Sequence, residues 1–108
     1  MTMEELIAKL RDMAKDISIP DSRFLAVQIN IKDREPGVFY VEVKDQRINI
    51  EPYEYYDRNC AITIKMNDFL KLLEGKLDAV AAFTLGKLKV DGDIGKALEF
   101  AELIKNKK

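Results

Sequence analysis

The spacing of apolar residues changes near residue 20, and this change limits the folds open to the chain. Over residues 3–17 apolar side chains recur every three or four positions, as on one face of an amphipathic helix. Pro20 disfavours helical geometry in Ile19 and is expected to end this segment. From residue 25 onward several segments alternate apolar with polar residues, as half-buried strands do. The predicted fold class is therefore α+β.

Short polar turns separate successive strands in this part of the chain, which favours an antiparallel meander of the first four. A fifth alternating segment comes after two short helical segments. Its strand must enter the same sheet beside an earlier strand, after a helical crossover. The strands are predicted over residues 25–31, 39–44, 48–50, 61–66 and 87–91, and the helices over residues 3–17, 68–73, 79–83 and 94–104.

Polar residues stand where the helices are predicted to begin. Thr2 followed by Glu5 forms a capping box, in which the hydroxyl and the carboxylate each accept a hydrogen bond from an otherwise unpaired backbone amide. Asn67, Asp78 and Asp93 are predicted to cap the three later helices. Each predicted helix thus has a candidate N-cap.

The residue types that the chain lacks exclude several functions. It has no His and a single Cys, so a Ser-His-Asp triad, a Cys-His pair, a His-ligated zinc and an intramolecular disulfide are all excluded. Cys60 is expected to open a strand as a small packing residue. Basic residues number 18 and acidic residues 19, which argues against nucleic acid as a partner. We expect no catalytic residue, no metal and no cofactor.

Length and terminal sequences bear on organisation and location. The 108 residues are predicted to form a single domain, residues 1–108. Residues 1–5 carry acids where a signal peptide needs bases, and residues 105–108 match neither a peroxisomal nor a prenylation signal. No apolar run approaches the roughly 18 residues of a membrane-spanning helix. We expect a cytoplasmic protein without stable membrane insertion.

Residues 52–59 contain three of the four tyrosines, Tyr53, Tyr55 and Tyr56, among several acidic side chains. One interpretation is a partly exposed loop whose rings cap the edge of the sheet. Another is a gate or an interface that pairs the protein with a second copy or with another protein. A homodimer, and an interaction module with a filled core and no ligand, are therefore open alternatives.

Several short motifs lie close together after Cys60. They are Ile62-Thr63-Ile64, Asp68-Phe69-Leu70, Gly75-Lys76-Leu77, Ala82-Phe83, Gly86-Lys87-Leu88-Lys89-Val90 and Gly92-Asp93. In this combination residues 60–108 resemble the sterol carrier protein-2 domain family. The resemblance is looser over residues 21–59 and weakest in the first helix. The turn Asp45-Gln46-Arg47 lacks the Gly that is usual there in the family.

The resemblance implies a five-stranded, mostly antiparallel sheet covered by helices, with an apolar tunnel. It implies a non-enzymatic protein that binds and transfers a lipid or fatty acyl ligand. The last helix is expected to act as a gate, because a terminal element opens at low cost. Periodicity alone does not distinguish a hollow core from a filled one. The wall residues carried over from the family are Phe69, Leu72, Leu73, Phe83, Leu85, Leu88, Val90, Leu98 and Ile104.

Overall fold

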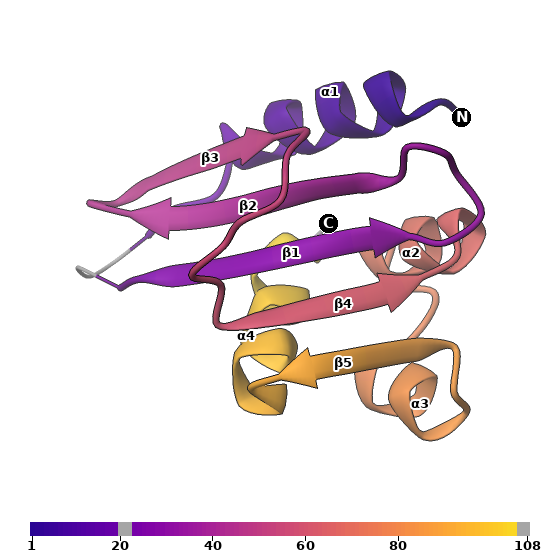
Figure 1. The fold of residues 1–108 in the computed structure, drawn as a ribbon. Helices are drawn as coiled ribbons and strands as arrows, with labels where there is room; N and C mark the ends of the chain where they lie inside the picture. Colours follow the sequence, from indigo (N-terminus) through magenta and orange to yellow (C-terminus); the bar gives the residue numbers. More distant parts are fainter. Residues whose placement is uncertain (20–22, 106–108) are drawn as a thin grey trace.

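The computed structural model describes residues 1–19 and 23–105, which form one sheet with helices against one of its faces (Figure 1). The prediction that Pro20 ends the first helix is wrong, because α1 ends at Ala14 and residues 17–19 are not helical. Pro20 itself and residues 106–108 lie outside the described residues. The elements agree with the predicted bounds within two residues, except that the first helix ends at Ala14. The helices are α1 (Met3–Ala14), α2 (Met66–Leu73), α3 (Ala79–Thr84) and α4 (Ile94–Ile104), and the strands are β1 (Leu25–Ile31), β2 (Val38–Lys44), β3 (Arg47–Glu51), β4 (Cys60–Ile64) and β5 (Leu88–Gly92).

The sheet is mixed, and its strands follow the order β3-β2-β1-β4-β5. β2 pairs antiparallel with β1 and β3, and β5 pairs antiparallel with β4, which confirms the mostly antiparallel sheet and the late entry of the fifth strand. The predicted meander of four strands is wrong, because β4 pairs in parallel with β1 instead of joining β3. The β2–β3 hairpin and the connection after it supply the chain length that a parallel neighbour requires.

The connection between β3 and β4 crosses the helix-free face of the sheet over β2 and β1 (Figure 1). We call residues 52–59 the crossover segment. In its middle, the Tyr55 backbone N–H donates to Oε1 of Gln28 at 3.1 Å. At its end, the Asn59 backbone N–H donates to the Ala26 carbonyl, and Asn59 Oδ1 accepts from the Ala26 N–H, both at 2.8 Å. The segment covers the β1–β2 part of this face and leaves β5 open (Figure 1).

The core fills the space between the sheet and the helices. Strand residues on the helix side are fully or almost fully buried, for example Ile29 in β1 and Phe39 in β2. Phe39 packs edge to face against Phe69 of α2, with ring centroids 6.0 Å apart. α4 lies over β1, β4 and β5 and adds Phe100 to the same buried cluster. The helices therefore share one apolar core with the sheet.

Three of the predicted helix caps are confirmed. Thr2 Oγ1 accepts from the Glu5 N–H at 3.1 Å while Glu5 Oε1 accepts from the Thr2 N–H at 2.8 Å. The Asp78 carboxylate accepts from the Ala81 N–H at the start of α3. Asp93 caps α4 in the same way.

The predicted cap of α2 is wrong. The helix begins at Met66, so Asn67 lies inside its first turn, and the N-cap residue is Lys65, whose side chain makes no capping bond. Instead, Oδ1 of Asp33 accepts from the Met66 N–H at 2.9 Å. This bond is the main reason why the pKa of Asp33 is lowered. A residue of the β1–β2 turn thus supplies the cap from a distant part of the sequence.

Candidate functional site

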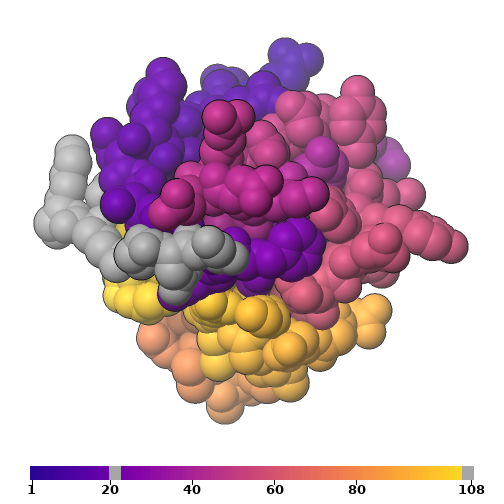
Figure 2. Space-filling view, turned by 90° about the vertical axis from the view of Figure 1, so that its left-hand side faces the viewer, coloured from indigo at the N-terminus to yellow at the C-terminus, as the bar shows by residue number. Residues whose placement is uncertain are grey.

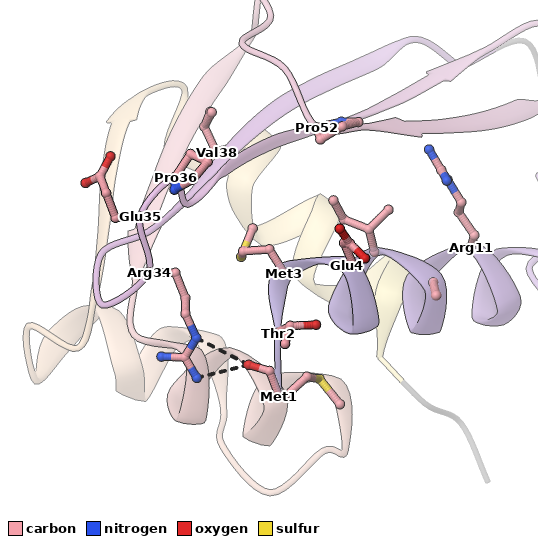
Figure 3. A pocket seen from close by; sticks show the side chains of 12 residues that line it. Met1, Thr2, Met3, Glu4, Arg11, Arg34, Glu35, Pro36, Val38 and Pro52 are labelled. Carbon is pink, nitrogen blue, oxygen red and sulfur yellow. Dashed lines mark hydrogen bonds between the residues drawn. The ribbon is translucent and has the colours of Figure 1, made fainter.

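A groove of about 780 Å³ lies between the first half of α1 and the β1–β2 turn (Figure 3). α1 forms one wall, and the turn and the start of β2 form the other. Seven of the twelve lining residues are apolar, so the groove suits an apolar ligand more than a polar one. These seven are Met1, Met3, Ile7, Ala8, Pro36, Val38 and Pro52.

Two arginines hold α1 in place beside the groove. Arg11 Nη2 donates to the Ile50 carbonyl at 2.7 Å and lies 3.2 Å from a carboxylate oxygen of Glu51, which joins α1 to β3. Arg34 Nε and Nη2 donate to the Met1 carbonyl at 3.2 and 3.1 Å, which joins the β1–β2 turn to the start of the chain (Figure 3). Glu51 and Asp33 lie beside these guanidinium groups, and Glu4 and Glu35 also line the groove, so charges of both signs lie at the edge of an apolar space.

α1 packs against few other elements of the fold. Only Leu6, Ile7 and Leu10 are buried among the described residues of this helix, and its main packing partners are β3 and α4. α4 by contrast packs against three strands and against the three other helices. α1 therefore has fewer packing partners than α4, although each of the two helices buries three apolar side chains.

A second, very small cavity lies under the other half of α1. Its volume is about 10 Å³, close to the minimum for one water molecule, and its walls are apolar. Leu10 and Met13 of α1 line it together with Ile48 of β3 and Ile104 of α4. Imperfect packing therefore continues beneath α1, beyond the groove.

The sequence profile of the SCP-2 sterol transfer family matches residues 5–105. The chain belongs to this family. Human "Sterol carrier protein 2" is 34% identical over 76 residues, which are 68% of this chain and 14% of the human protein. "Peroxisomal multifunctional enzyme A" of Dictyostelium discoideum is 42% identical over 50 residues, 46% of this chain and 11% of that protein. The chain therefore spans only a small part of these relatives.

Two solved structures of family members match the fold. The solution structure of palmitated SCP2L2 from Aedes aegypti has a TM-score of 0.73 and 22% identity, covering 98% of this chain and 96% of that one. The "UbiJ-SCP2 Ubiquinone synthesis protein" has a TM-score of 0.74 and 14% identity, covering 94% of each chain. These matches confirm the predicted α+β fold of the family.

The wall residues carried over from the family lie in several environments, and none of them lines the groove. Leu72 and Leu98 line a hollow of about 110 Å³ between α2, α3 and α4, and Ile104 lines the small cavity. Phe83 and Leu85 face outward, with 40% and 68% of their surface exposed. The role of all nine wall residues in binding stays a prediction. Phe69, Leu72, Leu73, Leu88 and Ile104 are buried in the core, and Val90 and Leu98 are partly buried.

Sequence reasoning missed the groove because its walls come from two segments that are polar on average. The helix supplies Met3, Ile7 and Ala8, and the turn supplies Pro36. The only sequence signal was that Met3 continues the apolar stripe of α1 beyond the three buried residues. A pairing of this stripe with the β1–β2 turn requires the tertiary structure.

Groups with chemical reactivity are few in the described part of the chain. Cys60 opens β4 as predicted and is buried, and this burial raises the pKa of its thiol to about 11. A thiol with that pKa is a poor nucleophile at neutral pH. Within residues 1–19 and 23–105, no group of three or more Cys, Asp or Glu side chains is placed to hold a metal ion. No helix there is long and apolar enough to span a bilayer.

Proposed function

We propose that the protein binds a lipid or fatty acyl ligand and transfers it without catalysing a reaction. The observation that carries this proposal is the groove of about 780 Å³ beneath α1, a size typical of ligand pockets. Membership of the SCP-2 sterol transfer family supports it, as does the likeness to a palmitated relative. The proposal keeps the cytoplasmic location predicted from the sequence.

The binding energy comes from burial of the acyl chain. Each methylene moved out of water contributes about 0.8 kcal/mol, so ten methylenes contribute about 8 kcal/mol, enough for a dissociation constant near the micromolar range. An anionic head group, such as a carboxylate, would lie at the groove mouth beside Arg34. Displacing the Met1 carbonyl from Arg34 would free the donors of the guanidinium for this head group.

α1 serves as the cover in this proposal, in place of the terminal helix expected from the sequence. When α1 moves outward, the groove and the small cavity beneath Leu10 become one space. The far end of the acyl chain then reaches Ile104 and, behind it, the other buried residues of the predicted wall. The predicted wall thus forms the deep end of the site and the groove forms its mouth.

Fatty acid binding is tested with a blocked groove. Ala8 is exposed and lines the groove, so Ala8→Trp fills the mouth without disturbing the core. Lys9→Trp is the matched control, because Lys9 is the next residue of α1, is exposed and does not line the groove. We expect Ala8→Trp to weaken displacement of a fluorescent fatty acid at least about tenfold, and Lys9→Trp to leave it unchanged.

Native mass spectrometry of the wild type with saturating palmitate provides the direct readout. If palmitate leaves both the mass and the fluorescence unchanged, the carrier function is wrong. If palmitate binds but both Trp variants bind it equally, the function stands and the groove is not its mouth. A larger effect of Leu98→Trp would then move the site to the hollow between α2, α3 and α4.

The alternative of an interaction module rests on the tyrosines of the crossover segment. Tyr53 and Tyr56 are 64% and 96% exposed, which leaves two rings available to a partner. Sedimentation of the wild type and of Tyr56→Asp distinguishes this function. A stable dimer that dissociates in Tyr56→Asp, combined with no uptake of lipid, would favour the module over the carrier.

A further inference from the structure

Four lysines lie at one corner of the sheet, where β1 and β4 end and β5 begins. α3 lies close to this corner (Figure 1). The crossover segment does not reach this corner, and all the lysines there are exposed. None of them forms an ion pair with another residue of the described ranges. The lysine corner consists of Lys32, Lys65, Lys87 and Lys89.

The strand registers bring these lysines together from three strands. β1 and β4 are parallel, and their register places Lys32 beside Lys65, one position beyond the last pair. β4 and β5 are antiparallel, and their register places Lys87 on the other side of Lys65. Lys89 follows within β5, opposite Thr63. Alternation within β5 directs Lys89 to the helix-free face, because its neighbour Leu88 is buried under the helices. Lys32, Lys65 and Lys87 lie one position outside their strands at the same end of the sheet.

The corner has little negative charge of its own to balance the lysines. Asp33 is the nearest acid in sequence, but its carboxylate already accepts from the Met66 N–H and lies 3.6 Å from Arg34 Nη1. Asp91 lies farther along β5, opposite Ala61. Like charges side by side on neighbouring strands destabilise a sheet. The charge of Lys65 helps to lower the pKa of Asp33, and an anionic surface against the corner would reduce the repulsion among the four lysines.

Apolar side chains protrude at the α3–β5 turn, which leads into Lys87. Leu85 and Phe83 come just before Lys87, and they are 68% and 40% exposed. Gly86 has a φ of +77°, so the chain turns sharply there and presents Leu85 at the tip. An apolar tip flanked by basic side chains is typical of proteins that lie on anionic membranes.

Figure 2 shows the end of the molecule opposite the lysine corner, with α4 in its lower half. The lysine corner is close to the groove in sequence. Lys32 precedes the β1–β2 turn, and Arg34, two residues later, lines the groove. A surface bound at the corner would therefore lie close to the mouth of the groove.

We propose that the lysine corner and the α3–β5 turn dock the protein on an anionic lipid bilayer, with Leu85 inserted among the head groups. This goes beyond the proposed function, because it assigns a partner to a different surface and holds whether or not the groove binds a ligand. A nucleic acid fits the surface less well. The exposed Leu85 has no role in contacts with phosphates, whereas it can insert among lipid head groups.

The charge component is tested by cosedimentation with vesicles of phosphatidylcholine alone and with vesicles in which about one lipid in three is phosphatidylserine. The test variant is Lys65→Glu/Lys87→Glu. The control is Lys9→Glu/Lys44→Glu, which changes the net charge equally at two exposed sites away from the corner. We expect the wild type to bind only the anionic vesicles, the test variant to bind them at least about tenfold more weakly, and the control to bind within about twofold of the wild type.

The apolar component is tested with tryptophan reporters, since the chain contains no Trp. The emission of Leu85→Trp should shift to the blue on anionic vesicles. The emission of Phe24→Trp, at the opposite end of β1, should not shift. The proposal is wrong if both charge variants lose binding equally, if neutral vesicles bind as well as anionic ones, or if the Leu85→Trp emission does not shift. Tighter binding to a duplex DNA oligonucleotide than to the vesicles would assign the corner to nucleic acid instead.

Discussion

The hydroxyl of Tyr55 donates a 2.7 Å hydrogen bond to Oε2 of Glu42. Asn49 Nδ2 donates to the other carboxylate oxygen at 3.0 Å, and the Tyr55 ring packs edge to face against Tyr40 with centroids 5.1 Å apart. One side chain thus attaches the crossover segment to β2. The ring cap anticipated from the sequence is made by Tyr55 and lies on the face of the sheet rather than at its edge.

Removing the Tyr55 hydroxyl should destabilise the fold. A hydrogen bond to a charged group contributes about 1.5–3 kcal/mol when buried, and partial exposure of Glu42 reduces this contribution. We expect Tyr55→Phe to lower the free energy of unfolding by about 1 kcal/mol in urea. Tyr53→Phe, at an exposed ring, should change it by less than about 0.5 kcal/mol. Equal effects of the two substitutions would contradict this role of Tyr55.

The same hydrogen bond makes stability depend on alkaline pH. It raises the pKa of Tyr55 to about 12, with a smaller contribution from burial. In the unfolded chain the tyrosine pKa is about 10. The contribution of Tyr55 to stability is therefore complete below about pH 10 and is lost as the pH rises toward 12. Tyrosinate absorbance should show a late-ionising tyrosine that disappears in Tyr55→Phe, and an unchanged titration curve would rule this out.

The β2–β3 turn stores conformational strain. Asp45 and Gln46 have φ values of +52° and +63°, the left-handed geometry of a type I′ turn, in which Gly is favoured. A residue other than Gly costs about 1 kcal/mol or more in this region. We expect Gln46→Gly to raise the free energy of unfolding by about 0.5–1 kcal/mol in a urea titration. Gln46→Ala keeps the strain and loses a 3.4 Å bond to the Ile19 carbonyl, so a gain in this control would refute the explanation.

Asp33 should stabilise the start of α2. Its carboxylate replaces a local N-cap for the Met66 N–H, and loss of such a cap destabilises a helix. Asp33→Ala should lower the free energy of unfolding, whereas Asp33→Asn, which keeps an acceptor oxygen, should lower it less. The pKa of Asp33 is lowered in the fold, so the stabilisation is present above about pH 4 and is lost as the pH falls further. A difference between wild type and Asp33→Ala that persists in strong acid would contradict this.

Local sequence patterns were sufficient to predict a helix cap where the capping residue is close in sequence to the helix start. The Thr2–Glu5 capping box and the Asp93 cap involve residues three positions apart, and both were predicted correctly. The cap of α2 was not predicted correctly, because Asp33 and Met66 come into contact only after β1 and β4 have paired. The parallel pair itself was missed for a related reason. The crossover segment has no apolar period that reveals its path across the sheet.

The ligand site could not be predicted from apolar spacing alone. Apolar spacing marks residues that avoid water, such as Phe69 and Leu88, and both are indeed buried. It does not tell whether such residues enclose a space or fill one. The groove depends on how far α1 stands from the β1–β2 turn, and that separation is set by Arg11, Arg34 and their carbonyl partners.

The parallel pairing of β1 with β4 also divides the chain into two halves with respect to folding order. On one side β1, β2 and β3 pair through short turns, and on the other side β4, β5 and the later helices pack locally. The two halves meet in the sheet where Val27 lies opposite Cys60, 33 positions apart (60 − 27). Closing that distance has an entropic cost that no local contact offsets in advance. We therefore expect each half to begin forming its structure independently, and the central seam of the sheet to close last.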